Sequence, residues 1–204
     1  EFTYKGQFYS LPEPVTCLPR PVQQPHPPIY VACFSRPTVE MAAEKGFHTL
    51  FAPFAAAMMF GSVGEAVQIY RELSANAGHT DARAKCSYFV NVVDTKAEEL
   101  QTKERLLRYL KSVLPAFPSD RETAPPHIAY FADIVERLQS MQPEQVGERS
   151  LVTGDAQACI ATLRKCEAAG IEEVILYFNF GHFSHQDTLR SMERFAREVM
   201  PHFS

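Results

Sequence analysis

Hydrophobic and polar positions follow two alternating periodicities from Pro28 onward. Short apolar runs indicate strands that are buried on both faces, at Ile29–Cys33, Thr49–Pro53, Cys86–Val93 and Glu173–Phe180. Apolar residues at helical spacing predict helices at Thr38–Lys45, Val63–Ala77, Lys96–Val113, His127–Ser140, Ala156–Ala169 and His185–Glu198. Repeated strand–helix units predict an α/β fold with a parallel sheet, either open or closed as a TIM-type barrel.

Residues 1–28 have a different pattern from the rest of the chain. Aromatic residues on both sides of Lys5-Gly6 predict a small hairpin. The prolines that follow, from Pro12 to Pro28, enforce an extended path with few backbone donors. We therefore divide the chain into a hairpin and proline-rich lead-in at 1–28 and a body of βα units at 29–204.

The strand count constrains the architecture of the body. Four βα units are half of what a (β/α)8 barrel needs, and half a barrel leaves a free strand edge on each side. We expect those edges to be paired by further sequence, by a second copy of the chain or by another subunit. The chain begins with Glu-Phe rather than Met, which favours further N-terminal sequence.

The turn after the first parallel strand has the pattern of an anion site. Strand Ile29–Cys33 is followed by Phe34-Ser35-Arg36-Pro37-Thr38, where Pro37 suits the first turn of a helix. Ser35 and Thr38 place hydroxyl groups beside free N–H groups at the positive end of that helix, which is typical of a phosphate site. Simple N-capping by Ser35 is the alternative.

Two further sets of residues are candidates for a site. Asn179 and His182 follow the last predicted strand, at the end where barrel active sites are built, so they could contact a substrate or cofactor, or only cap the loop and line a pocket. His182 and His185 stand three positions apart, but no Cys or carboxylate set accompanies them, and we expect no metal site. The apolar residues after the second strand, from Phe54 to Phe60, either line a pocket for a hydrophobic group or pack in the core.

Composition excludes several classes of partner. A net charge of −4 gives no general attraction to nucleic acid, and no apolar stretch is long enough to span a membrane. The five cysteines form no CxxC pair, and their odd number argues against a complete set of disulfides. Reduced thiols in a cytoplasmic protein are therefore expected.

Several segments together resemble one known family. PVQQPHPPIYVACFS, continued by TVEMAAEKG, is similar to the central segment of the bacterial-luciferase-like, flavin-dependent monooxygenases. FAPF, EAVQIYRELSANAGH and YFVNVVDTKAEE resemble the next segments in the same order, and the stretch from LVTGDA to MPHF resembles the C-terminus. The resemblance covers nearly the whole chain.

The family resemblance implies a (β/α)8 barrel that binds reduced FMN, or a deazaflavin in some branches, at the C-terminal ends of its strands. This chain matches the second half, strands five to eight. The positions that the family motif then assigns to the cofactor are Ala32, Cys33, Phe34, Ser35, Thr38, Leu50 and Ala52. Ser35 and Thr38 are expected to bind the phosphate, and Leu50 and Ala52 to lie near the isoalloxazine ring.

The chemistry implied is the reaction of reduced flavin with O2 to oxygenate a small organic substrate, with FMN favoured over deazaflavin and a flavin reductase as a partner. The polar residues near the reacting flavin edge belong to the family's N-terminal half, so we name no catalytic residue. Two alternatives remain open, a non-catalytic flavin-binding half-barrel and a structural subunit that completes a partner's barrel.

Overall fold

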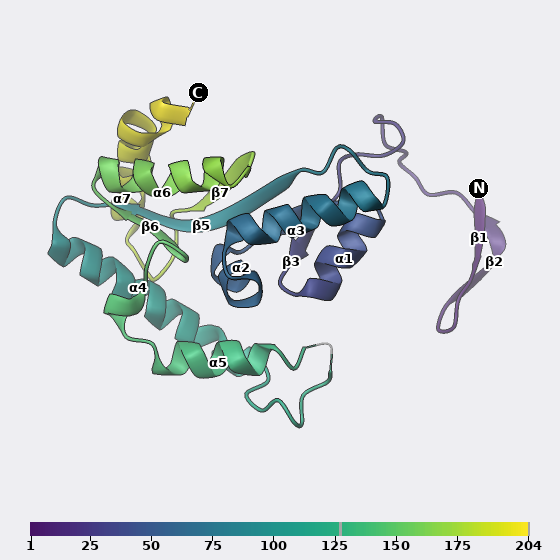
Figure 1. Ribbon diagram of the computed structural model, residues 1–204, viewed down its shortest axis with the longest axis horizontal. Helices are drawn as coiled ribbons and strands as arrows, with labels where there is room; N and C mark the ends of the chain where they lie inside the picture. Colours follow the sequence, from purple (N-terminus) through teal and green to yellow (C-terminus); the bar gives the residue numbers. More distant parts are fainter. Residues whose placement is uncertain (127, 204) are drawn as a thin grey trace.

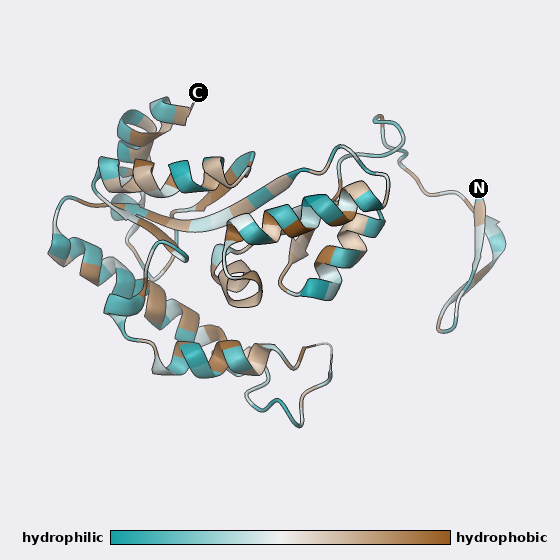
Figure 2. Ribbon diagram, in the orientation of Figure 1, coloured by the Kyte–Doolittle hydropathy of each residue, from teal (hydrophilic) through white to brown (hydrophobic). Residues whose placement is uncertain are grey.

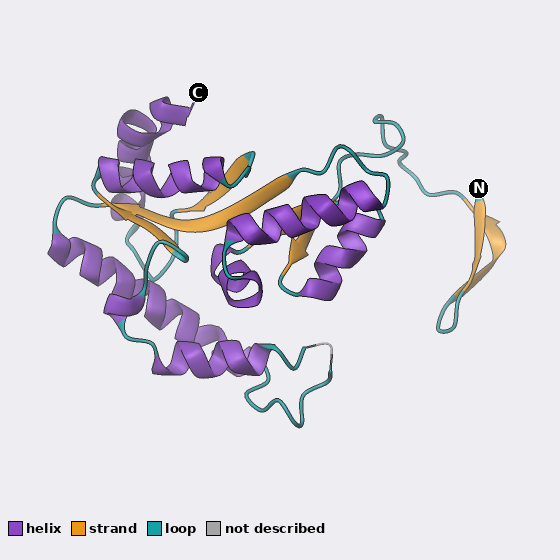
Figure 3. Ribbon diagram, viewed as in Figure 1, coloured by secondary structure: helices purple, strands orange, loops and turns teal. Residues whose placement is uncertain are grey.

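The computed structural model describes residues 1–126 and 128–203 and contains a parallel sheet covered by helices, with a separate hairpin at the N-terminus (Figures 1 and 3). The strands are β1 Phe2–Lys5, β2 Ser10–Val15, β3 Tyr30–Cys33, β4 His48–Phe51, β5 Ala84–Val92, β6 Leu151–Gly154 and β7 Glu173–Tyr177. The α-helices are α1 Arg36–Glu44, α2 Pro53–Phe60, α3 Val63–Asn76, α4 Lys96–Val113, α5 Phe131–Ser140, α6 Ala156–Ala168 and α7 His185–Arg194. Shorter turns of helix are η1 Leu114–Ala116, η2 Pro143–Gln145, the π-helical η3 Phe195–Val199 and η4 Met200–Phe203.

The predicted elements are confirmed, with shifted ends, and two elements were missed. Predicted helix Lys96–Val113 is α4, residue for residue. The predicted strand over 49–53 ends earlier, because Pro53 begins α2, a helix that the sequence did not reveal. The predicted strand over 173–180 ends at Tyr177. The second missed element is β6, and the predicted start of α5 at His127 lies outside the described residues.

β5 organises the sheet. β4 pairs in parallel with its residues 84–86, β6 with residues 89–92, and β7 with residues 85–89. Because β7 overlaps both other partners in register, β4 and β6 share one edge of β5 and β7 lies along the opposite edge. β3 pairs with β4. The four predicted strands thus run in the order β3-β4-β5-β7, and the count of four is corrected to five parallel strands by β6.

Side chains of β5 alternate between two unlike faces of the sheet. Cys86, Tyr88 and Val90 are buried with the apolar sides of α1, α3 and α6, on what we call the outer face. Lys85, Ser87 and the rest of the inner face are only partly buried. The prediction of strands that are apolar on both faces is therefore wrong for β5, whose inner face carries polar residues.

The amphipathic helices cover the sheet because each presents one apolar side. Brown and teal segments follow each other along α3 and α4 in Figure 2, as expected for amphipathic helices. α4 and α5 form a second apolar cluster with Phe89 of the inner face, centred on Leu106, Leu107 and Leu138. The sheet therefore has one face fully packed by helices and one face covered at the end where β6 lies.

The lead-in at 1–28 is the predicted hairpin followed by an extended segment. β1 and β2 pair antiparallel, and the hairpin projects away from the body at the right of Figure 1. Its large apolar side chains are exposed, with Phe8 at 84% and Tyr9 at 82%. The hairpin contributes nothing to either apolar cluster of the body.

Candidate functional site

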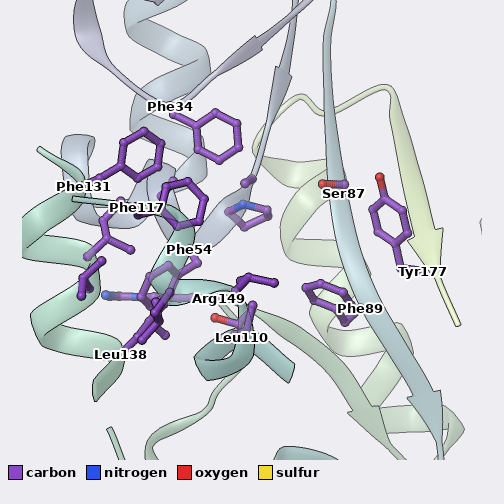
Figure 4. A pocket seen from close by; sticks show the side chains of 18 residues that line it. Phe34, Phe54, Ser87, Phe89, Leu110, Phe117, Phe131, Leu138, Arg149 and Tyr177 are labelled. Atoms are coloured by element: carbon purple, nitrogen blue, oxygen red, sulfur yellow. The ribbon is translucent and has the colours of Figure 1, made fainter. Parts of the chain in front are cut away.

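A cavity of about 300 Å³ opens on the inner face, between the end of β4 and the start of β6 (Figure 4). Ala52 to Ala55 approach it from β4 and Arg149 and Ser150 from β6, with Ser87 on β5 behind them. Since β4 and β6 lie end to end along the same edge of β5, the gap between them creates this space. The sheet topology itself therefore makes the cavity.

Six aromatic rings line the cavity. Phe117, before the 118–130 segment, stacks on Phe131 at the start of α5, with ring centroids 4.7 Å apart, and Phe34 lies 6.5 Å from Phe131. Across the cavity, Phe89 of β5 and Tyr177 of β7 have centroids 5.7 Å apart. Figure 4 shows these two groups on opposite sides of the space. Such a cavity suits a flat organic ring, since aromatic faces pack well against one another.

The predicted phosphate turn lies directly beside this cavity. Phe34, which lines the wall, is followed by Ser35 at the N-cap position of α1. Ser35 makes no side-chain capping bond; its hydroxyl is instead 2.9 Å from the hydroxyl of Thr38. Arg36 is engaged by Glu40 at 3.0 Å. Ordinary capping therefore does not explain Ser35, and the paired hydroxyls stand at the positive end of a helix.

A family model described as luciferase-like monooxygenase matches residues 1–173. The chain belongs to the luciferase-like monooxygenase family. The oxygenase component of flavin-dependent trigonelline monooxygenase from Acinetobacter baylyi is 25% identical over 217 residues, covering 100% of this chain and 56% of that protein. The family resemblance seen in the sequence is confirmed.

Solved structures share the fold. Monooxygenase RslO1 from Streptomyces bottropensis matches with a TM-score of 0.72 at 20% identity, covering 100% of this chain and 56% of that one. An F420-dependent secondary alcohol dehydrogenase, solved with an F420–acetone adduct, matches with a TM-score of 0.66 at 14% identity, covering 98% and 55%. The chain thus spans about half the length of the relatives that it matches.

The cofactor positions expected from the family motif divide between the two faces. Phe34 and Ala52 line the cavity. Ala32, which is exposed, and Leu50 are partners in register on the inner face and are not among the residues that line the cavity. Cys33 points to the outer face, where it is 1% exposed and burial raises the pKa of its thiol to about 12. Its side chain is therefore a packed, protonated core group, and only its backbone approaches the turn.

Asn179 and His182 are exposed residues of the loop after β7 and are not among the residues that line the aromatic cavity. The loop is fixed by Arg105, whose guanidinium donates to the carbonyl oxygen of His182 at 2.8 Å. Tyr177, at the end of the strand itself, lines the cavity instead. Within 1–126 and 128–203, no group of three or more His, Cys, Asp or Glu side chains is arranged to hold a metal ion.

The apolar segment after β4 turns out to serve both of the uses considered for it. Phe54 lines the cavity, whereas Phe60 packs against the core of the outer face. Arg149, Phe117 and Phe131 were missed by the sequence analysis. The two phenylalanines flank a segment whose sequence indicates only a surface loop with prolines at both ends. Arg149 precedes a strand that was not predicted. No local sequence pattern therefore marks any of the three residues.

Across the described residues, no helix combines the length and the apolar character that crossing a lipid bilayer requires.

Proposed function

We propose that this chain is the FMN-binding part of a luciferase-like monooxygenase that oxygenates a small organic substrate. The observation that carries the proposal is the hydroxyl pair of Ser35 and Thr38 at the start of α1, adjoining an aromatic cavity through Phe34. A flavin mononucleotide has the matching two parts, an anionic phosphate and a flat apolar ring. The turn adjoins the cavity, just as the phosphate and the ring belong to one FMN molecule.

The residues of the turn fit a phosphate group. Two hydroxyls and the N-terminal N–H groups of α1 are donors, and a dianionic acceptor at this end of a helix is stabilised by its dipole. Pro37 contributes no N–H, which leaves the hydroxyls of Ser35 and Thr38 as important donors at the turn. In the complex, we propose that Phe34 and Ala52 contact the ring.

When bound, reduced FMN supplies the chemistry that activates O2 for insertion into the substrate. The chain's own residues bind, orient and exclude water. Phe117 and Phe131 line the cavity on the helical side, while Phe89 and Tyr177 form the opposite wall. With FMN bound, apolar walls of this kind would help to keep water from the reacting groups, which limits unproductive loss of the activated oxygen.

FMN is proposed rather than a deazaflavin because the relative from Acinetobacter baylyi is named as a flavin-dependent monooxygenase. That relative is also named as an oxygenase component, so we propose that a separate flavin reductase supplies reduced FMN to this chain. A deazaflavin-dependent enzyme shares the fold, but it matches at only 14% identity. The turn would serve the phosphate of either cofactor.

We further propose that β3, β4, β5 and β7 correspond to strands five to eight of the family's barrel. Among the described residues, β3 and β7 each pair with a single strand, so each has a free edge. Free edges favour pairing with another strand. Barrel strands outside the 204 residues, or those of a second copy, would satisfy them and cover the inner face.

The test is retention of FMN by the purified 204-residue chain. After incubation with FMN and desalting, the visible absorbance of the protein fraction is expected to show stoichiometric flavin. Circular dichroism of the same fraction verifies the fold. A folded chain that emerges without flavin would contradict the proposal and favour a structural role.

A further inference from the structure

Arg149 is the one charged side chain among the 18 residues that line the aromatic cavity. It lies between η2 and β6, just before the first strand residue, Leu151. Within the described chain its guanidinium has no hydrogen bond or ion pair. The neighbouring carboxylate of Glu148 is already paired with Lys165. Arg149 is exposed to solvent where it lines the cavity, and with no internal counter-ion its guanidinium is available to pair with an anionic ligand.

A second arginine reinforces this positive end. A smaller cavity of about 80 Å³ adjoins the aromatic one, since Phe54, Arg149 and Ser150 line both. Arg137 of α5 also lines the smaller cavity, with its guanidinium 5.9 Å from the centroid of the Phe54 ring. In the described part of the chain Arg137 also has no carboxylate partner. Two arginines and the Phe54 ring therefore lie at the end of the aromatic cavity that adjoins the smaller one.

We propose that this end of the cavity binds the carboxylate of a planar aromatic substrate. The substrate ring would lie against Phe54, at the end of the cavity shared with the smaller one, and Arg149 would hold the carboxylate, with Arg137 adding charge. Guanidinium groups match carboxylates because they offer parallel donors in one plane. The inference rests on the proposed function, because it names the substrate class of the site proposed there.

The flavin phosphate is the other anion that could occupy this end. Figure 4 shows Phe34, next to the phosphate turn, in the upper part of the group of side chains and Arg149 in its lower part, beside Phe54. A phosphate held by Ser35 and Thr38 therefore leaves the arginine end for a different anion. If Ser35 and Thr38 bind the phosphate, their alanine variants should lose FMN affinity. If Arg149 binds it, the Arg149→Gln variant should lose FMN affinity instead.

The experiment compares 2-naphthoate with its neutral analogue 2-naphthamide, titrated into the 204-residue chain by calorimetry without FMN. Naphthoate is expected to bind at least about tenfold more tightly, because a hydrogen-bonded charge is lost in the amide. Arg149→Gln is expected to remove most of this preference, and Arg149→Lys to retain part of it. The matched control is Arg108→Gln, which should leave the preference for naphthoate intact. Arg108 is an exposed residue of α4 and lines neither the aromatic cavity nor the smaller one.

Equal binding of the two probes, or no binding of either, would overturn the proposal, as would an equal loss in the Arg108 and Arg149 variants. FMN titrations of the same variants distinguish a failure of the carboxylate assignment from a failure of the proposed FMN site. Unchanged FMN affinity in Arg149→Gln is expected. If FMN affinity falls and the naphthoate preference persists, Arg149 serves the flavin phosphate and the carboxylate assignment is wrong.

Discussion

Replacing both Ser35 and Thr38 by alanine is expected to weaken FMN binding by roughly a hundredfold or more. Each hydroxyl would donate to a charged phosphate oxygen, and such a hydrogen bond contributes about 1.5–3 kcal/mol. Two of them amount to at least about 3 kcal/mol, which is about two orders of magnitude in Kd. Neither hydroxyl caps the helix in the free chain, so the loss should fall on the ligand rather than on the fold.

The measurement is a fluorescence titration of FMN with the unmodified and the double-variant chains. Thr80→Ala with Ser119→Ala, two exposed positions far from the turn in sequence, is the matched control and should bind FMN normally. Riboflavin, which lacks the phosphate, should bind the double variant and the unmodified chain equally. An unchanged FMN affinity in the Ser35 and Thr38 variant would remove the turn from the site.

Phe51→Ala is expected to lower the free energy of unfolding by about 3–5 kcal/mol. Phe51 is 0% exposed and lies on the outer face of β4, in register with Cys33 and Cys86 of the neighbouring strands. Removing its ring leaves a cavity under α1 and α3 that packed neighbours cannot fill. Because typical domains are stable by only about 5–15 kcal/mol, this is a large share of the total.

Urea denaturation followed by circular dichroism measures the effect. Phe8→Ala removes the same ring from a position that is 84% exposed in the hairpin, and its expected change is within about 0.5 kcal/mol. Equal losses at Phe8 and Phe51 would mean that the outer-face core does not hold β4 as described.

The sequence predicts elements whose pattern is local and fails where tertiary context decides. α4 was located to the residue, because its apolar positions recur at helical spacing; the structure adds a capping box at Thr95 and Glu98. α2 is apolar on all sides, so it shows no periodicity that separates helix from strand. β6 has only four residues and forms because β5 extends beyond β4 and offers a free edge there. No sequence pattern within Leu151–Gly154 indicates that this segment pairs with β5.

The same distinction divides the candidate site. Phe34, Ser35 and Thr38 are contiguous on a strand–turn–helix unit, so their juxtaposition could be predicted from the motif. The remainder of the cavity combines side chains from distant segments, such as Phe131 of α5 and Arg149 before β6. Their convergence depends on how α4 and α5 fold back over the inner face, which the sequence pattern does not encode locally.

The most direct test of the central claim is the ratio of the riboflavin and FMN dissociation constants for the unmodified 204-residue chain. The two ligands share the ring and differ by the phosphate, so the ratio reports on the phosphate site alone. If the turn at Ser35 and Thr38 holds the phosphate, FMN should bind at least about a hundredfold more tightly. Equal affinities, or no binding of FMN by the folded chain, would contradict the account.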